Sequence, residues 1–195
     1  MIRAILNKSS CLVYDPKGEL FAQTGGSAKT IYRLDLNDPT RSDRWNFIPK
    51  CRNDPAFACQ LAGMMIGIES RRRTNADPFW GDAEQIALTA ILLHIAEVYR
   101  ENAIPAFAAD FLLFLSGDND QAFNDAMTNS PSLYAKQAYM AFRQAPVQTR
   151  GSILIGLYNK LRPFTLAPAR MVTVPPTRDE EVSGCRSINF ADLRK

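Results

Sequence analysis

The chain has 195 residues, of which 46% are hydrophobic and 22% charged, as is ordinary for a soluble globular protein of one domain or slightly more. Its net charge of +3 is too small to indicate nucleic-acid binding by itself, so any such argument must rest on a local cluster of basic residues. The sequence shows neither a signal-peptide pattern nor an apolar run long enough for a membrane helix, so we expect a cytoplasmic domain.

Two short strands are predicted near the N-terminus. Residues 11–14 form an apolar run that ends at the turn Asp15-Pro16-Lys17-Gly18, as a buried strand does. Residues 19–23 can form a short helix, and residues 30–36 alternate between apolar and polar side chains as a second strand. This order is typical of a parallel βαβ unit. Because two strands alone do not make a stable sheet, we expect the rest of that sheet to be missing from this chain.

A run of helices is predicted to follow. From residue 54 to residue 171 apolar residues recur at helical spacing, and we expect six or seven helices. Residues 172–187, with Pro175-Pro176, are predicted to be extended and to run back towards the two strands. The pattern therefore favours a mainly α protein, an all-α domain inserted into an α/β sheet. The predicted helices span residues 54–68, 77–100, 107–115, 119–127, 132–142, 149 or 152 to 161 and, as a short helix, 164–171.

The stretch from Asp77 to Arg100 is predicted to be the central helix. Asp77 is a good N-cap, and Pro78 at the first helical position loses only an N–H group that would be unpaired anyway. Between Ile86 and Ala96 apolar residues lie on nearly every face, so a single apolar stripe cannot account for them. We expect the other helices to surround this one.

No metal motif is apparent among the cysteines and the histidine. His94 is the only histidine, and Glu97 is the only possible ligand at helical spacing from it, so a hydrogen-bonded core histidine is favoured over a metal ligand. Cys11 and Cys59 lie in apolar surroundings, and we interpret them as reduced core thiols of a cytosolic protein. None of the cysteines has zinc-site spacing; they are Cys11, Cys51, Cys59 and Cys185.

The segment from Gly25 to Thr30 partly matches a phosphate-binding loop. Such a loop needs Gly-x-x-x-x-Gly-Lys-Ser/Thr before a helix, whereas position 23 is Gln, position 28 is Ala, and a strand is predicted to follow. We favour a helix end followed by a strand. A stand-alone NTPase that uses these residues is the enzymatic alternative.

Arg71-Arg72-Arg73 is the densest cluster of basic residues. It could contact phosphates or an acidic segment of a partner. Aromatic residues are not interleaved with it, so a solvated loop is the favoured alternative. Phe107, Phe111 and Phe114 lie on the apolar face of their helix, which indicates core packing rather than base stacking.

The turn after the first predicted strand carries charges that could serve a ligand. Asp15, Lys17 and Glu19 place two carboxylates and one ammonium at the C-terminal end of a parallel strand, where open α/β sheets bind ligands. A salt-bridged turn explains the same residues equally well.

Several of these stretches occur in the order found in one protein family. They are the strand and turn at residues 12–20, the second strand at 32–36, the turn at 45–48, Asp77-Pro78-Phe79-Trp80, and Ile188-Asn189-Phe190 with the final Leu193-Arg194-Lys195. Together they resemble the TraG/TraD-type coupling proteins of type IV secretion and conjugation. Asp-Pro-Lys-Gly-Glu is shared with related DNA-pumping ATPases, and the Asp-Pro-Phe-Trp helix narrows the resemblance.

The resemblance implies an all-α domain inserted into a RecA-like ATPase core. Such a parent is a homo-hexamer anchored at the bacterial inner membrane, with ATP and Mg²⁺ as cofactors. Its Walker A loop would precede residue 1 and its Walker B residues would follow residue 195, so we expect a fragment without a cofactor of its own, monomeric and unable to hydrolyse ATP alone. The expected parts are residues 1–50 from the ATPase core, 51–171 as the all-α domain, and 172–195 as an extended return.

The resemblance also implies roles for the charged residues. Asp15, Lys17 and Glu19 would lie near the nucleotide, while Arg71, Arg72 and Arg73 are the candidate contacts to nucleic acid or other cargo. The all-α domain would recognise the relaxosome, DNA or a secreted protein and pass it to the secretion channel. A helical adaptor unrelated to secretion is a further alternative.

Overall fold

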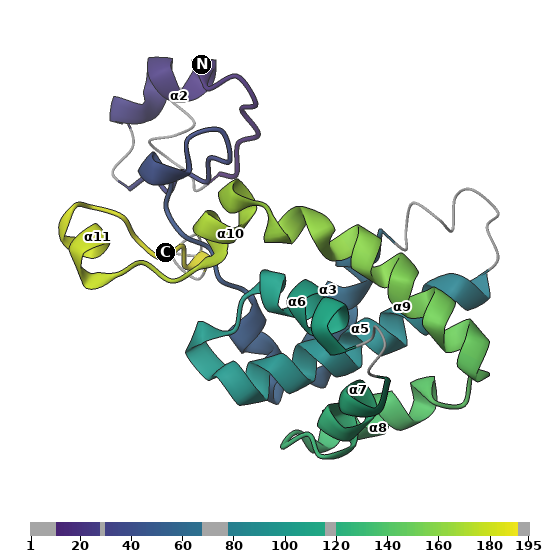
Figure 1. Cartoon of the computed structure of the whole chain (residues 1–195). Coiled ribbons are helices and arrows are strands. Elements are labelled where there is room, and N and C mark those ends of the chain that lie inside the picture. Colours follow the sequence, from purple (N-terminus) through teal and green to yellow (C-terminus); the bar gives the residue numbers. More distant parts are fainter. Residues whose placement is uncertain (1–10, 28–29, 68–77, 116–119, 191–195) are drawn as a thin grey trace.

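A computed structural model describes residues 11–27, 30–67, 78–115 and 120–190 of the chain (Figure 1). These residues are mainly helical, as the sequence predicts, and they contain no strand. Their one isolated β-bridge is parallel and joins Arg44 to Ser187. Figure 1 shows one large group of helices, with α2 and α11 lying outside it. No described helix has both the length and the apolar character needed to cross a membrane.

The strands predicted at residues 11–14 and 30–36 are absent, so this prediction is wrong. A strand needs a neighbouring strand to bind its N–H and C=O groups. None is available among the described residues, and the N–H of Arg33 donates instead to the carboxylate of Asp43 at 2.8 Å. Leu12 and Tyr14, which a sheet would bury, are exposed. The short helix predicted between the strands is present as α2 (Glu19–Thr24).

The helices predicted between residues 54 and 171 are all present, with ends that differ by a few residues. We call residues 51–171 the helical body. A further helix, α11 (Arg178–Val182), interrupts the segment predicted to be extended, which is a correction for those residues. The helices are α3 (Pro55–Ile66), α5 (Pro78–Tyr99), α6 (Pro105–Leu115), α7 (Asp120–Thr128), α8 (Leu133–Phe142), α9 (Val147–Leu161) and α10 (Ala167–Thr173), joined in part by the 3₁₀ turns η2 (Pro39–Arg41), η3 (Ile48–Asn53), η4 (Arg100–Asn102) and η5 (Arg162–Thr165).

The central position predicted for α5 is confirmed. Every residue from Ala87 to Ala96 is buried, so these turns are covered on all sides. Helices α3, α6, α7, α8 and α9 pack against α5. Each fully buried Leu or Ile side chain contributes roughly 1.5–3 kcal/mol, so α5 is the main source of hydrophobic stabilisation in the body. Asp77, its predicted N-cap, lies outside the described residues.

Local capping residues fix where α3 and α8 begin and where α3 ends. The Asp54 carboxylate accepts a hydrogen bond from the N–H of Phe57 at 2.9 Å, and the Ser132 hydroxyl accepts one from the N–H of Ala135 at 3.2 Å. Each cap stabilises its helix by about 1 kcal/mol. Gly67, with φ of 69°, ends α3 in the left-handed conformation that glycine adopts without strain.

Ion pairs attach the surrounding elements to α5. Lys160 of α9 pairs with Glu84, a buried residue of α5. Gly156 leaves room for this pair, because a Cβ atom there would lie 3.1 Å from the Glu84 Oε1 atom. Arg52 of η3 pairs through two nitrogens with Glu97, at 3.1 and 3.2 Å. The orientation of α9 and η3 on the core is therefore set by charge as well as by apolar packing.

His94 is a hydrogen-bonded core residue, as predicted. Its Nδ1 atom lies 2.9 Å from the Ser130 hydroxyl, and its ring packs beside Phe111. Phe107 and Phe111 pack partly buried against the core, which confirms their predicted role. The side chain of Phe114 lies outside the described part of the chain.

All four cysteines are free thiols, but they differ in burial. Cys51 is buried, and burial together with the nearby Asp54 carboxylate raises its pKa to about 12. Cys11 and Cys59 are exposed, so the prediction that they belong to the core is wrong. Cys59 lies at the exposed edge of the contact between α3 and α5, where its carbonyl accepts a hydrogen bond from Gln85 of α5 at 2.9 Å. Its apolar neighbours in sequence point to the other side of the helix.

We predict that acidification destabilises the fold through His94. Burial lowers the pKa of this imidazole below its ordinary value of 6.5. The unfolded chain therefore binds the proton at a higher pH than the folded chain, and the free energy of unfolding falls as the pH drops below about 6.5. Urea unfolding at a series of pH values measures this fall. His94→Gln does not titrate and should show a shallower pH dependence; an equal slope in both chains would contradict the assignment.

Candidate functional site

The chain enters and leaves the helical body at one place. Just before the body, the N–H of Trp45 donates to the carbonyl of Val172 at 2.7 Å. The N–H of Arg44 donates to the carbonyl of Arg186 at 2.8 Å, and the N–H of Ile188 donates to the carbonyl of Arg44 at 2.7 Å. Two segments that are far apart in sequence therefore lie side by side. We call the charged residues that hold them together the junction; they are Arg33, Asp43, Arg44, Glu180 and Arg186.

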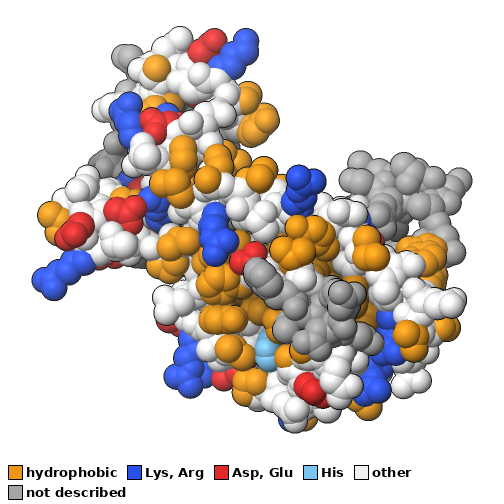
Figure 2. Space-filling view, in the orientation of Figure 1, with side chains coloured by type: hydrophobic (Ala, Val, Ile, Leu, Met, Phe, Trp, Pro, Cys, Tyr) orange, Lys and Arg blue, Asp and Glu red, His pale blue; other side chains and the backbone are white. Residues whose placement is uncertain are grey.

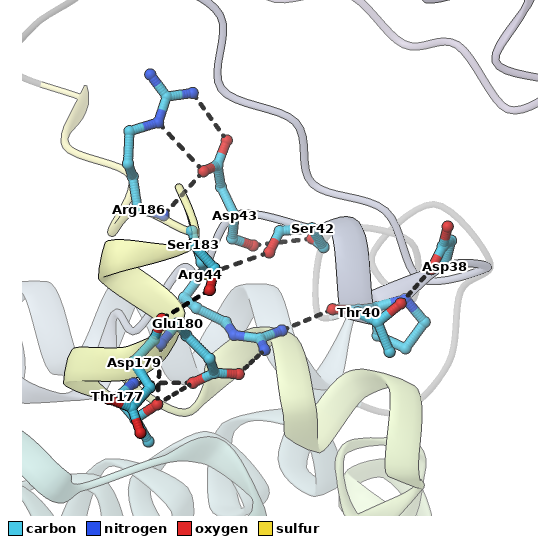
Figure 3. Close-up of polar contacts among 12 residues, drawn as sticks. Asp38, Thr40, Ser42, Asp43, Arg44, Thr177, Asp179, Glu180, Ser183 and Arg186 are labelled. Atoms are coloured by element: carbon cyan, nitrogen blue, oxygen red, sulfur yellow. Dashed lines mark hydrogen bonds and ion pairs between the residues drawn. The ribbon is translucent and has the colours of Figure 1, made fainter.

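Asp43 is the acceptor at the centre of the junction (Figure 3). Only 7% of this residue is exposed. Its carboxylate accepts from the N–H of Arg33 at 2.8 Å and from the N–H of Arg186 at 3.0 Å, and it forms an ion pair with the Arg186 guanidinium at 3.3 Å. A buried carboxylate is costly unless it is paired in this way, so Asp43 requires both segments to be in place.

Arg44 complements Asp43 with a buried guanidinium. The residue is 4% exposed, and its guanidinium donates to the carbonyl of Pro39 at 2.8 Å and to the Glu180 carboxylate at 2.6 Å (Figure 3). The backbone N–H of Thr177, the Arg44 guanidinium and the Thr177 hydroxyl hold the pKa of Glu180 below its ordinary value. Glu180 is therefore a carboxylate at neutral pH, as the ion pair needs.

The start of α11 has a signal in the sequence, although residues 172–187 were predicted to be extended. Thr177 and Glu180 form a capping box, in which the Thr177 hydroxyl accepts from the N–H of Glu180 and the Glu180 carboxylate accepts from the N–H of Thr177. The pattern Thr-x-x-Glu is a recognised start of a helix. The cap also holds Glu180 where it meets Arg44, so the same residue begins the helix and closes the junction.

Aromatic side chains add further contacts between the two segments that meet at the junction. The ring of Trp45 lies 5.0 Å from that of Phe47 and 5.2 Å from that of Phe190, measured between centroids. The Arg186 guanidinium lies 4.7 Å from the centre of the Tyr32 ring. The Trp45–Phe190 and Tyr32–Arg186 contacts therefore join the same two parts of the chain as the ion pairs do.

A pocket of about 340 Å³ adjoins the junction on the side of α10. Its charged residues already have partners, because Arg44 pairs with Glu180 and Arg170 pairs with Asp110 at 3.4 Å. The remaining lining is mostly apolar. The pocket is lined by Arg44, Ala167, Arg170, Met171, Val174, Pro175 and Glu180.

The residues predicted near a nucleotide lie in the turn before α2 and in its first residue. The Asp15 carboxylate accepts from the N–H of Phe21 at 2.8 Å and so stabilises the start of α2, while Lys17 and Glu19 are exposed. The described residues contain no group of three or more His, Cys, Asp or Glu side chains that could hold a metal ion. The residues described here do not by themselves fit a nucleotide with Mg²⁺. Arg71, Arg72 and Arg73 lie outside the described residues.

The segment at Gly25 to Thr30 differs from a phosphate-binding loop in the part that is described. Gly25–Ser27 forms the 3₁₀ turn η1 directly after α2, and residues 28 and 29 lie outside the described residues. The residues that follow, 31–35, are not helical. A phosphate-binding loop needs a helix there, because the N–H groups of its first turn bind the phosphate.

A family model described as type IV secretory system conjugative DNA transfer matches residues 1–174. No curated protein and no solved structure matches the chain.

We predict that Asp43→Asn loosens the junction while the helical body stays folded. The substitution removes the charge that Arg186 pairs with, and hydrogen bonds to charged groups contribute roughly 1.5–3 kcal/mol each. Amide exchange at Arg44 and Ile188 should accelerate by about tenfold or more, whereas exchange in α5 should not change. Glu181→Gln, which alters an exposed carboxylate of α11, is the matched control. Unchanged exchange at Arg44 in Asp43→Asn would show that the junction does not depend on Asp43.

Proposed function

Because this chain belongs to the type IV secretory system conjugative DNA transfer family, we propose that its helical body recognises the cargo of such an apparatus and passes it to the secretion channel. The cargo is the relaxosome, its DNA, or a secreted protein. The observation that carries this proposal is the junction, where both ends of the helical body meet.

A module attached at one place leaves most of its surface free for a partner. The segments at residues 33–45 and 172–188 hold each other through ion pairs of the buried Asp43 and Arg44, so the body need not share its other faces with the domain that carries it. This is the geometry of a domain inserted into another. It supports the resemblance to coupling proteins, in which an all-α domain projects from an ATPase core.

We further propose that the cofactors act outside the helical body. ATP and Mg²⁺ would be bound by an ATPase core that assembles as a homo-hexamer at the bacterial inner membrane. Asp15, Lys17 and Glu19 would lie at the edge of that core. The turn at residues 15–18 leads into α2, and the Phe21 ring of α2 lies 4.8 Å from the Arg33 guanidinium of the junction, which supports this placement.

A stand-alone NTPase built on Gly25 to Thr30 is the rival function, and the geometry favours the recognition module. We predict that the purified chain turns over no more ATP than its Lys29→Ala variant, because the segment after Thr30 supplies no helix N-terminus for phosphate. ATP turnover that is robust in the wild-type chain and lost in Lys29→Ala would favour the rival.

If DNA is the cargo, we predict that Arg71, Arg72 and Arg73 contribute phosphate contacts. Replacing all three by Ala should weaken binding and reduce the slope of log K against log salt by about three, since each phosphate contact releases a counterion. Filter binding of single- and double-stranded DNA at two salt concentrations measures both effects.

A matched control removes three exposed cations elsewhere. Replacing Arg41, Lys50 and Arg178 by Ala changes the net charge by the same amount as the Arg71/Arg72/Arg73→Ala variant does. This control should leave the affinity for DNA nearly unchanged. No DNA binding at low salt, or a triple Arg71/Arg72/Arg73→Ala variant that binds as the wild type does, would exclude the arginine cluster and leave protein as the cargo.

A further inference from the structure

A long acid-free segment runs through the second half of the helical body. Between Asp125 and Asp179 lie seven of the 23 basic residues of the chain and none of its 20 acidic residues. The overall charge of +3 conceals this local excess, because the acidic residues are concentrated elsewhere. The segment includes α8, α9 and α10, and its basic residues are Lys136, Arg143, Arg150, Lys160, Arg162, Arg170 and Arg178.

Some of these cations are neutralised by carboxylates from other helices, and some are not. Lys160 pairs with Glu84, and Arg170 pairs with Asp110. By contrast, Lys136, Arg143 and Arg150 have no carboxylate partner within the described part of the chain. The Arg150 Nε atom is buried without a hydrogen bond. A partly buried guanidinium without a counter-charge is unfavourable, so a carboxylate from a partner would gain most here.

The outer face of α8 is apolar where a solvent-facing helix is normally polar. Positions 133, 136, 140 and 143 follow one another at helical spacing, so they form a single stripe. In this stripe Leu133 is 66% and Met140 is 53% exposed, and each is followed by a cation, Lys136 or Arg143. The opposite face is buried in the core through Ala135, Tyr139 and Phe142.

The stripe continues onto the start of α9. Val147, the first residue of α9, is 66% exposed, and Arg150 lies one turn further on. Figure 2 shows Lys and Arg side chains beside hydrophobic ones at the lower right of the body, where Figure 1 places the end of α8 and the start of α9. We call this the α8–α9 surface; it consists of Leu133, Lys136, Met140, Arg143, Val147 and Arg150.

We propose that the α8–α9 surface binds an acidic amphipathic segment of a partner protein. Apolar side chains of that segment would cover Leu133, Met140 and Val147, and its carboxylates would pair with the three cations. Arginine suits this task, because its planar fork binds a carboxylate through two hydrogen bonds. Methionine and arginine are also enriched in protein–protein interfaces.

Nucleic acid fits this surface less well than an acidic protein does. A phosphate backbone offers nothing apolar to cover the exposed Leu, Met and Val side chains, and the six residues of the surface include no aromatic ring on which a base could stack. The binding of an acidic segment rests on the proposed function at one point only, which is the identification of the partner protein as secretion cargo. The binding itself is tested without any secretion apparatus.

The test uses the purified 195-residue chain and synthetic peptides. The probe is a fluorescent peptide of about 18 residues, or five helical turns, with Leu on one face and Glu on the other. A second peptide has the same composition in scrambled order. We expect fluorescence anisotropy to show binding of the first peptide, with an affinity about tenfold higher than for the scrambled one.

Substitutions then locate the binding site. Arg143→Glu, Lys136→Glu and Met140→Ser should each weaken binding by about tenfold. Arg178→Glu and Val182→Ser alter an exposed cation and an exposed apolar residue on α11, and these matched controls should bind as the wild type does. Circular dichroism verifies that each variant keeps its helix content.

Two results would overturn the proposal. One is equal binding by the wild type and by the folded Arg143→Glu and Met140→Ser variants. The other is that the acidic peptide binds no better than its scrambled control and is displaced by a single-stranded oligonucleotide. In that case the affinity of the oligonucleotide would fall in Arg143→Glu but not in Met140→Ser. Neither result bears on the DNA titration of the Arg71/Arg72/Arg73→Ala variant, so the two proposals fail separately.

Discussion

A buried carboxylate and a buried guanidinium at neighbouring positions hold the two ends of the helical body together. Asp43 and Arg44 are almost inaccessible to water, and burying a charge is unfavourable unless an opposite charge or several hydrogen-bond donors meet it. Both find their partners in a segment about 140 positions later in the chain, Arg186 for Asp43 and Glu180 for Arg44. The helical body must therefore begin and end at the same place. Its topology is a closed loop of helices fastened at the junction.

Inside that loop the packing is organised by α5. A run of ten buried residues, from Ala87 to Ala96, can be satisfied only if other helices cover every side of it. Once α5 is enclosed, the outer faces of the surrounding helices are left to solvent, those of α3, α8 and α9 among them. Ordinary solvation accounts for polar side chains on these faces. It does not account for the alternation of apolar residues with basic residues that have no carboxylate partner among the described residues, and this is why we assign the α8–α9 surface to a partner.

The features that the sequence predicted correctly are those decided within a few turns of chain. The starts of α3 and α8, where Asp54 and Ser132 cap the helices, and the all-round apolar α5 depend on residues within a few turns of one another. The lack of a second histidine or a cysteine at helical spacing from His94 is likewise local, although its hydrogen-bond partner Ser130 lies 36 positions later in the chain. The strands at residues 11–14 and 30–36 failed because a strand exists only if another strand lies beside it, and local alternation carries no information about that. The prediction that Cys59 belongs to the core was wrong because the buried apolar residues near it in sequence lie on another face of α3.

The candidate site was harder to predict, for a related reason. Nothing in the sequence distinguishes Glu180 and Asp43 from carboxylates exposed to solvent. Only the fold brings Glu180 to Arg44 and Asp43 to Arg186. The α8–α9 surface has a signal in the sequence, but the signal is a long absence of acidic residues. Dense clusters of basic residues point to Arg71-Arg72-Arg73 and not to this acid-free segment, in which the basic residues are spread out.

The central claim is that the helical body is fastened at the junction and binds its partner elsewhere. Nuclear Overhauser cross-peaks between backbone protons of Arg44 or Trp45 and those of Val172, Arg186 and Ile188 test it most directly, in the free chain and with DNA or the acidic peptide bound. The account predicts these cross-peaks in both states, because the parallel bridge between Arg44 and Ser187 brings those protons together. Their absence from the free chain, or their loss when the partner binds, would contradict it.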